Sequence, residues 1–145
     1  MKVVVKSPET REEFEKYCDL RWRILRAPLN RPRHIVTDEI DDKSIKIIVC
    51  EENGDVIGTG RASFNSAIEA QIRSMAVEEN YQGKGIGSLI VSELEKRATK
   101  FGVKKIIIDS RDSAEKFYEK HGYKVTNESY ILLDKIPHIR MIKNF

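Results

Sequence analysis

A glycine-rich loop between an apolar segment and a helical pattern constrains this chain more than any other feature. The loop reads Gln82-Gly83-Lys84-Gly85-Ile86-Gly87, and the helical pattern continues from Ser88 to Lys100. Its glycines let the backbone turn tightly and leave it uncovered by side chains. The N–H groups of the loop and of the first helical turn have no partner inside the helix, and the helix dipole favours negative charge there. A strand, a bare loop and a helix in this order predict a binding position for a phosphate group.

The spacing within the loop tests two familiar phosphate-binding motifs. A P-loop needs Gly, four residues and then Gly-Lys-Ser/Thr, whereas Lys84 is followed by Gly85, so this motif is excluded. A dinucleotide-binding motif needs Gly-x-Gly-x-x-Gly directly after the strand. Ser88 stands where the third glycine should be, and residues 78–82 separate the strand from the loop. Asp109 ends the next apolar run, as a ribose-binding acid would, so the dinucleotide interpretation is weakened and stays open.

Two motifs resemble those of a known family. Gln82-x-x-Gly85-x-Gly87 resembles the acyl-CoA pyrophosphate loop of the GNAT family of N-acetyltransferases, Arg/Gln-x-x-Gly-x-Gly/Ala. Residues 114–123 are similar to that family's second motif, Ala-x-x-Phe-Tyr-x-x-x-Gly-Phe/Tyr, and Met75-Ala76-Val77 is similar to the end of its fourth strand. The two motifs occur in the family's order, with one helix and one strand between them. The resemblance covers residues 45 to 125 well and the ends loosely.

Size and composition predict one domain, residues 1–145, with one core, because 40% of the residues are hydrophobic. No apolar run approaches the ~20 residues of a membrane span, and Met1–Lys6 is too short for a secretion signal. Cys18 and Cys50 fit no metal spacing and no disulfide framework, so we expect no metal and reduced thiols in a cytoplasm. The net charge of +3 does not support a nucleic-acid partner.

Hydrophobic periodicity and turn residues predict the order of helices and strands. Strands are expected at Lys2–Lys6, Ile45–Glu51, Val56–Phe64, Ala67–Val77, Lys105–Asp109, Lys124–Thr126 and His138–Lys143, and helices at Glu9–Arg26 (starting at Ser7-Pro8), after the glycine loop up to Gly102, and from an Asp112 cap to His121. Ala27–Asp42 is expected to be a loop. This order implies an α/β fold with a mixed, mostly antiparallel central sheet and helices on both faces, which is also the fold of the GNAT family.

The resemblance implies transfer of an acetyl group from acetyl-CoA to a primary amine, directly, within a ternary complex. It places the coenzyme on Met75, Ala76, Val77, Gln82, Gly83, Lys84, Gly85, Ile86, Gly87, Ser88, Arg111 and Phe117. A strand amide near Met75 would stabilise the oxyanion. Arg111 stands where the family often has an Asn that contacts the pantetheine, so this contact is open.

The resemblance also implies that Tyr118 is the general acid that protonates the departing thiolate. A phenol suits this role because it is protonated at neutral pH. The alternative is a packing aromatic, because residues 114, 117 and 118 share one helical face. For the base, the first candidate is Glu69, which begins the strand beside the thioester. Other candidates are Glu39, His34 and His138. Each of the four is more typical of a surface or capping residue, and water could also remove the proton.

Two further interpretations stay open at this point. A non-catalytic acyl-CoA-binding regulatory module would keep the glycine loop without needing Tyr118. Arg21, Arg23 and Arg26 could bind an acidic acceptor, or they could form a solvated helix face. The expected partners are acetyl-CoA and an amine acceptor, with neither nucleic acid nor membrane, and exposed C-terminal edge strands could pair in a homodimer.

Overall fold

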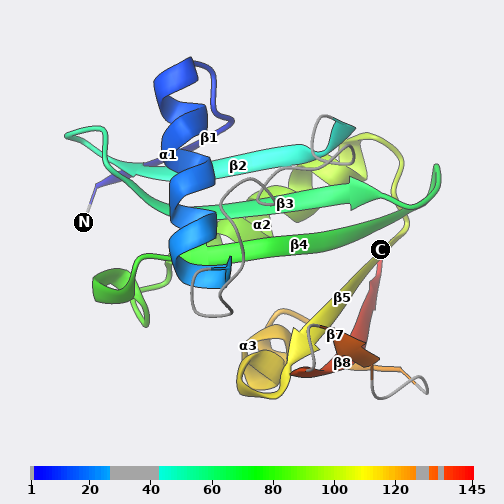
Figure 1. Ribbon diagram of the computed structural model, residues 1–145. Helices are drawn as coiled ribbons and strands as arrows, with labels where there is room; N and C mark the ends of the chain where they lie inside the picture. Colours follow the sequence, from blue (N-terminus) through cyan, green and yellow to red (C-terminus); the bar gives the residue numbers. More distant parts are fainter. Residues whose placement is uncertain (1, 27–42, 127–130, 134–135) are drawn as a thin grey trace.

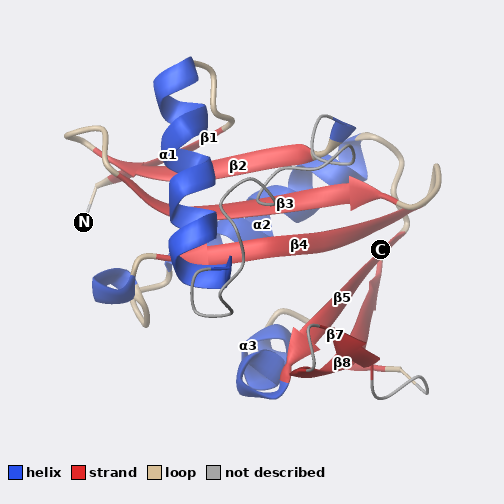
Figure 2. Cartoon of the chain, in the orientation of Figure 1, coloured by secondary structure: helices blue, strands red, loops and turns tan. Residues whose placement is uncertain are grey.

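The computed structural model describes residues 2–26, 43–126, 131–133 and 136–145. Its elements, shown by type in Figure 2, are β1 (Val3–Lys6), α1 (Arg11–Arg21), a π-helical turn (Trp22–Arg26), β2 (Ile45–Glu51), β3 (Val56–Phe64), β4 (Glu69–Val77), a 3₁₀ turn (Glu79–Tyr81), α2 (Ile86–Lys100), β5 (Lys105–Arg111), a 3₁₀ turn (Asp112–Ala114), α3 (Glu115–Lys120), β6 (Lys124–Val125), β7 (Ile131–Leu133) and β8 (Ile136–Asn144).

Within this described part of the chain, eight strands form one sheet in the order β1-β2-β3-β4-β5-β8-β6, with β7 also paired to β8. Only β4 and β5 run parallel, and every other pair is antiparallel. Helix α1 covers one face of β2, β3 and β4, and α2 lies behind the same strands (Figure 1). The predicted mixed, mostly antiparallel sheet with helices on both faces is confirmed.

Each face of the sheet has its own apolar core. The larger core lies under α2 and includes Ile47, Val49, Ile72, Ile90, Leu94, Ile106 and Met141. The smaller core lies under α1 and includes Tyr17, Leu20, Ile48, Val56 and Ala76. The Ile106-Ile107-Ile108 run of β5 is buried throughout, as predicted for a strand covered on both faces.

Two glycines of β3 allow α2 to approach the sheet closely. A Cβ on Gly58 would lie 2.7 Å from Cγ2 of Ile86, and a Cβ on Gly60 would overlap the side chain of Ile90. The first turns of α2 therefore lie against bare backbone, which fixes where the glycine loop enters the helix. No pattern in the sequence predicted this contact.

A β-bulge interrupts β4 just before its end. Arg61 pairs with Arg73 and Thr59 pairs with Ala76, so Ser74 and Met75 together lie opposite the single residue Gly60. The bulge changes which face each position of β4 points to. Ala70 and Ile72 face the core under α2 before the bulge, and Met75 and Val77 face it afterwards.

Strands β4 and β5 separate after four paired residues. Their pairing runs from Glu69↔Lys105 to Ile72↔Ile108 and ends there. Strand β5 nevertheless remains paired with β8 as far as Arg111↔His138, while β4 remains paired with β3 as far as Val77. Figure 1 shows β5 diverging from β4 toward α3. We call the opening between residues 73–77 of β4 and residues 109–111 of β5 the fork.

Several predicted boundaries were wrong. Helix α1 begins at Arg11 rather than after Ser7-Pro8, because Thr10 caps it and forms a capping box with Glu13. The regular helix ends at Arg21, and the last residues of the predicted helix form the π-helical turn.

At the other end of the chain, α3 begins at Glu115 with Ala114 as its cap, two residues later than the predicted cap, Asp112. The short strand β7 was not predicted. The loop predicted for residues 27–42, including the base candidates His34 and Glu39, lies outside the described residues.

Candidate active site

The glycine loop joins the end of β4 to α2 and has the backbone that the sequence predicted. Gly83 and Gly85 have φ angles of 78° and 85°, in the left-handed region where glycine is favoured. Gly85 is the N-cap of α2, and no side chain caps the helix there. Open space surrounds the position that a Cβ would take on either glycine. The first N–H groups of α2 therefore have no side-chain cap and lie beside an uncovered loop, which suits an anionic ligand.

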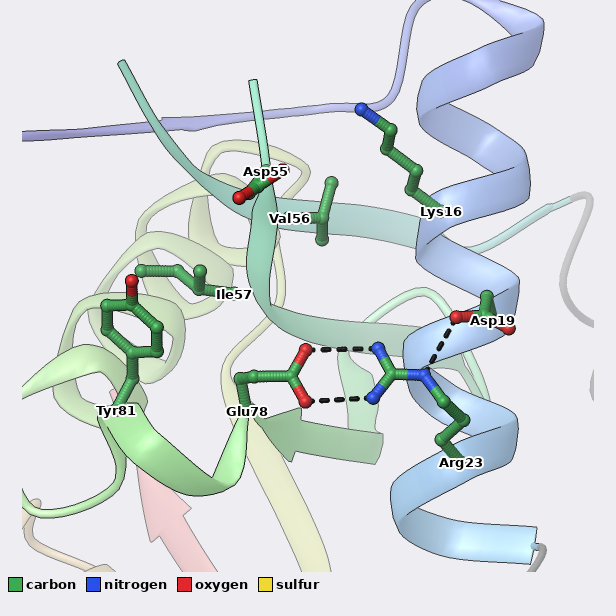
Figure 3. A pocket seen from close by; sticks show the side chains of 8 residues that line it. All are labelled: Lys16, Asp19, Arg23, Asp55, Val56, Ile57, Glu78 and Tyr81. Atoms are coloured by element: carbon green, nitrogen blue, oxygen red, sulfur yellow. Dashed lines mark hydrogen bonds and ion pairs between the residues drawn. The ribbon is translucent and has the colours of Figure 1, made fainter. Parts of the chain in front are cut away.

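Three side-chain contacts hold the segment that leads into the loop. Arg23 donates from Nη1 and Nη2 to the two carboxylate oxygens of Glu78 at 2.8 and 3.0 Å (Figure 3). These hydrogen bonds lower the pKa of Glu78. The Tyr81 hydroxyl donates to Oε1 of Glu51 at 2.7 Å, and Nε2 of Gln82 donates to the carbonyl of Val77 at 3.1 Å. The loop is therefore fixed at its β4 end before any ligand binds.

A cavity of about 230 Å³ lies beside these anchors. It is lined by Lys16, Asp19, Arg23, Asp55, Val56, Ile57, Glu78 and Tyr81 (Figure 3). Arg23 bridges Asp19 and Glu78 across it. Because Arg23, Asp19 and Glu78 engage one another, we interpret this cavity as part of the support of the loop.

Helix α3, the start of α2 and the bulged end of β4 converge at the fork. The hydroxyl of Tyr118 donates to Sδ of Met75 at 3.5 Å. The ring of Phe117 lies 3.1 Å from the position that a Cβ would take on Gly87. The structure thus brings together four of the predicted site residues, Met75, Gly87, Phe117 and Tyr118.

The Tyr118 side chain is only 8% exposed, and burial raises its pKa to about 12. Its ring also packs against those of Phe117 and Tyr123, with centroids 5.0 and 6.0 Å away. Both predicted roles, packing and proton donation, are therefore compatible with its position. The hydroxyl stays protonated at neutral pH and points at a residue of the fork.

Comparison with known proteins identifies the family of this chain. The sequence model of the acetyltransferase (GNAT) family matches residues 12–123. This chain belongs to the GNAT family. It is 29% identical over 144 residues to the uncharacterised N-acetyltransferase YjcF of Bacillus subtilis, an alignment that covers 99% of this chain and all of YjcF.

Solved structures show the same fold. An aminoglycoside 6'-N-acetyltransferase complexed with coenzyme A superposes with a TM-score of 0.81 at 17% identity, covering 99% of this chain and 97% of that one. Ard1 from Thermoplasma volcanium superposes with a TM-score of 0.79 at 19% identity, covering 99% and 98%. Membership of the GNAT family makes the chain an acyl-CoA-dependent acetyltransferase.

The structure does not bring Glu69 together with the other predicted site residues of this GNAT protein. Glu69 lies six positions before Met75, about 20 Å along the strand. Its carboxylate accepts from Nδ2 of Asn65 at 2.8 Å and pairs with Lys105 at 3.1 Å. The hydrogen bond from Asn65 is the main cause that lowers its pKa.

Arg111 and His138 face each other at the last described pair of β5 and β8. The Arg111 side chain is exposed at the end of β5, beside the fork, whereas His138 is 9% exposed. Arg111 is thus within the region where the family resemblance places the pantetheine.

A contact between Ser88 and His121 was not predicted. The Ser88 hydroxyl and Nε2 of His121 lie 3.0 Å apart, which ties the first turn of α2 to the end of α3. The His121 ring also packs on Phe117, with centroids 4.9 Å apart. The only signal in the sequence was that residues 117 and 121 are one helical turn apart.

A chain of hydrogen bonds crosses the closed end of the fork and was also not predicted. Arg73 donates to Ser63 at 2.9 Å and to Oε1 of Gln71 at 3.0 Å. Gln71 in turn donates to Asp109 at 3.3 Å, and Arg140 donates to both Asp109 oxygens at 2.8 and 3.1 Å. Alternating polar residues at 71 and 73 of an apolar strand were a signal that this face is lined with polar groups.

Across the described ranges, no helix is both long and apolar enough to cross a membrane.

Proposed function

We propose that this protein transfers an acetyl group from acetyl-CoA to a primary amine by direct attack within a ternary complex. The supporting observation is that the open glycine loop, the fork and the Tyr118 hydroxyl lie side by side. The structure of a relative complexed with coenzyme A further supports the choice of coenzyme, and its aminoglycoside substrate supports an amine acceptor.

In this proposal the loop residues Gln82 to Ser88 hold the pyrophosphate through backbone N–H groups, with Lys84 adding positive charge at the rim. The pantetheine lies in the fork along Met75, Ala76 and Val77, where the inner edge of β4 has no ladder partner on β5. Phe117 and Arg111 flank it.

The amine nitrogen attacks the thioester carbonyl, the carbon–sulfur bond breaks and the amine loses a proton. A backbone N–H of β4 near Met75 stabilises the oxyanion, and a preorganised donor of this kind contributes roughly 2.7–4 kcal/mol.

Tyr118 stabilises the departing thiolate. Its pKa of about 12 exceeds the roughly 8.5 of an ordinary thiol, so complete proton transfer to sulfur is uphill. The hydroxyl therefore acts chiefly as a hydrogen-bond donor to the developing charge, and solvent completes the protonation. Proton removal from the amine is assigned to water, because Glu69 is engaged by Asn65 and Lys105. The alternative assignment to Glu69 stays a prediction, tested by turnover of Glu69→Gln.

We further propose a cytoplasmic location, which the free thiols of Cys18 and Cys50 support. A homodimer through the β6 edge of the sheet stays a prediction for measurement of mass in solution.

Calorimetric titration with acetyl-CoA, followed by a thiol-release assay over a panel of amines, tests the main proposal. We expect one acetyl-CoA bound per chain and release of thiol that depends on amine. Tight binding without turnover of any amine would favour a non-catalytic binding module, and failure to bind acetyl-CoA would refute the proposal.

A further inference from the structure

Two neighbouring contacts join the start of α2 to α3. The ring of Phe117 lies against Gly87, and one helical turn further along, at the C-cap of α3, the imidazole of His121 lies against Ser88. Gly87 and Ser88 are the second and third residues of α2. His121 therefore lies beside the helix start to which the proposed function assigns the diphosphate of the coenzyme.

Ser88 brings two donors to this position. The first hydrogen bond of α2 runs from the N–H of Leu89 to the carbonyl of Gly85 at 3.2 Å, so the N–H of Ser88 precedes the regular helical hydrogen bonds. The second donor is the Ser88 hydroxyl, whose oxygen lies 3.0 Å from Nε2 of His121. Whether this hydroxyl can serve a ligand depends on the histidine.

The contact between Ser88 and His121 allows two arrangements of hydrogen atoms. If Nε2 carries no hydrogen, it accepts the hydroxyl hydrogen, and the hydroxyl has none left to donate. If Nε2 carries a hydrogen, it donates to Oγ of Ser88, and the hydroxyl can donate to a third group. An ionised diphosphate oxygen accepts hydrogen bonds and donates none, so it is compatible only with the second arrangement.

The surroundings of His121 permit the second arrangement and hold the ring in place. No described residue forms a hydrogen bond with Nδ1 that would keep the hydrogen on that nitrogen. The ring packs on Phe117 with centroids 4.9 Å apart, and the backbone N–H of His121 donates to the carbonyl of Tyr118 at 3.0 Å. An imidazole fixed in this way orients the Ser88 hydroxyl before a ligand binds, which lowers the cost of binding.

We propose that His121 is a positioning residue for the coenzyme: its Nε2–H donates to Oγ of Ser88, so that the Ser88 hydroxyl donates to the diphosphate. This inference rests on the acetyltransferase function proposed above and adds a pair of side chains to its backbone donors. Hydrogen bonds to charged groups are the stronger ones, and linked hydrogen bonds polarise one another. Loss of either side chain should therefore weaken coenzyme binding about tenfold.

Two acetyl donors distinguish this role from a structural one. Acetyl-CoA carries the diphosphate, and S-acetylpantetheine carries the same thioester arm without it. His121→Phe keeps a ring against Phe117 and removes the ring nitrogens. We expect this variant to raise the dissociation constant of acetyl-CoA about tenfold, with little change in kcat at saturating acetyl-CoA or in kcat/KM for S-acetylpantetheine. Equal losses of kcat/KM with both donors, or an unchanged affinity for acetyl-CoA, would overturn the inference.

Variants of both partners test whether the pair acts as a unit. Ser88→Ala should weaken acetyl-CoA binding by a similar factor, and the double variant should lose no more affinity than the weaker-binding single variant. His121→Gln, whose amide can donate in place of Nε2, should keep part of the affinity. Ser92→Ala, at an exposed serine one turn further along α2, should bind as the wild type does.

Additive losses in the double variant would contradict the paired role. If His121→Phe does not fold, Ser88→Ala and His121→Gln decide through the same comparison of donors, and an unchanged affinity of Ser88→Ala for acetyl-CoA would overturn the inference.

The hydrogen on the imidazole gives a measurement that does not depend on turnover. The chain has three histidines, and comparison with His121→Gln assigns the His121 signals in proton–nitrogen correlation NMR spectra. With coenzyme A at saturation, we expect Nε2 of His121 to carry a hydrogen. An Nε2 without a hydrogen in this complex would overturn the inference, whereas failure of coenzyme A to bind the wild type would instead refute the proposed function.

Discussion

Tyr118 shows how one environment can serve both packing and chemistry. Its ring is surrounded by Phe117 and Tyr123, and its hydroxyl points at Met75 in the fork. Burial raises the pKa to about 12, so the group keeps its proton through the whole range in which an amine becomes neutral. A donor that does not titrate in this range leaves the pH dependence of turnover to the acceptor amine.

Removal of this hydroxyl should affect turnover more than binding. Tyr118→Phe keeps the packing ring and is expected to lower kcat by about tenfold to a hundredfold, with the dissociation constant of acetyl-CoA nearly unchanged. Because its pKa is near 12, we also expect wild-type kcat to show no loss from Tyr118 ionisation between pH 8 and about 10. Steady-state kinetics over pH and calorimetry measure both effects.

Tyr123→Phe is the matched control, since Tyr123 is a neighbouring buried tyrosine that bonds to Glu95 instead of pointing at the fork. Tyr123→Phe should lower the free energy of unfolding and leave kcat unchanged. Equal turnover in Tyr118→Phe and the wild type would contradict the role assigned to Tyr118.

Sequence reasoning found the residues whose type alone is informative, and missed those whose partners are distant. Glycines at 83 and 85 predict a tight turn uncovered by side chains, and in the structure both have left-handed backbone. The bond between Arg140 and Asp109, by contrast, depends on the register of β8 on β5, which joins residues 31 positions apart. No local pattern encodes that register.

At the scale of elements, the loop and α2 form one unit in which backbone geometry determines binding. Gly85 caps α2 at a φ of 85° and leaves the helix start uncovered. Gly54, in the β2–β3 hairpin, has a similar φ of 91° and is likewise surrounded by open space. Substitutions at these two glycines therefore distinguish the stability lost through strained backbone from an effect on ligand binding.

Gly85→Ala should lower the free energy of unfolding by about 1 kcal/mol, because an L side chain is strained at positive φ. It should also weaken acetyl-CoA binding about tenfold or more, since the added methyl group would enter the open space in which we propose that the phosphate binds. Gly54→Ala should cost similar stability without any change in binding. Denaturant unfolding and calorimetry on both variants check this, and equal affinities for acetyl-CoA would contradict the proposed loop function.

The start of α1 carries a pH dependence of its own. Glu13 accepts from Nζ of Lys6 and from the backbone N–H groups of Glu9 and Thr10, which lowers its pKa to about 2. The unfolded chain takes up this proton near the ordinary value of about 4.3. The stabilisation is therefore complete above that value and is lost as the pH falls toward 2.

Glu13→Gln should consequently show a smaller loss of stability between pH 5 and about 2 than the wild type, measured as the urea midpoint at each pH. Glu12→Gln removes an exposed carboxylate of the same helical turn and serves as the control. An identical pH profile for Glu13→Gln and the wild type would refute the linkage.

At the scale of the whole molecule, the sequence predicted the layers of the fold better than the ends of its helices and strands. Strands β2 and β3 have the predicted bounds, because the Asn53-Gly54 turn and the apolar runs mark both limits. The start of α1 was wrong because Ser7-Pro8 and Thr10 are both good caps, and the capping box of Thr10 with Glu13 starts the helix at Arg11. The resemblance to the GNAT family, in which the fourth and fifth strands splay apart around the pantetheine, implies the fork, and no pattern in β4 or β5 predicts it.

Binding of coenzyme should stabilise the entire fold, since the loop, both arms of the fork and α3 all contribute to one site. Acetyl-CoA at about a hundred times its dissociation constant adds about 2.7 kcal/mol, which raises the midpoint of thermal unfolding by about 5–10 °C for a chain of this size. NAD at the same concentration should produce no shift. Calorimetric scans compare the two, and stabilisation by NAD alone would favour the dinucleotide interpretation.

The bulge in β4 determines which face of the sheet each later residue of the strand points to. Even-numbered residues of β4 face α2 before Ser74, and odd-numbered residues face it afterwards. One supernumerary residue thus lets a single strand show Arg73 to one side of the sheet and Met75, two places later, to the other. If these residues of β4 paired without the bulge, strict alternation would turn the Met75 sulfur to the face of Arg73, away from Tyr118. In this segment the number of residues matters as much to the proposed active site as the identity of any side chain.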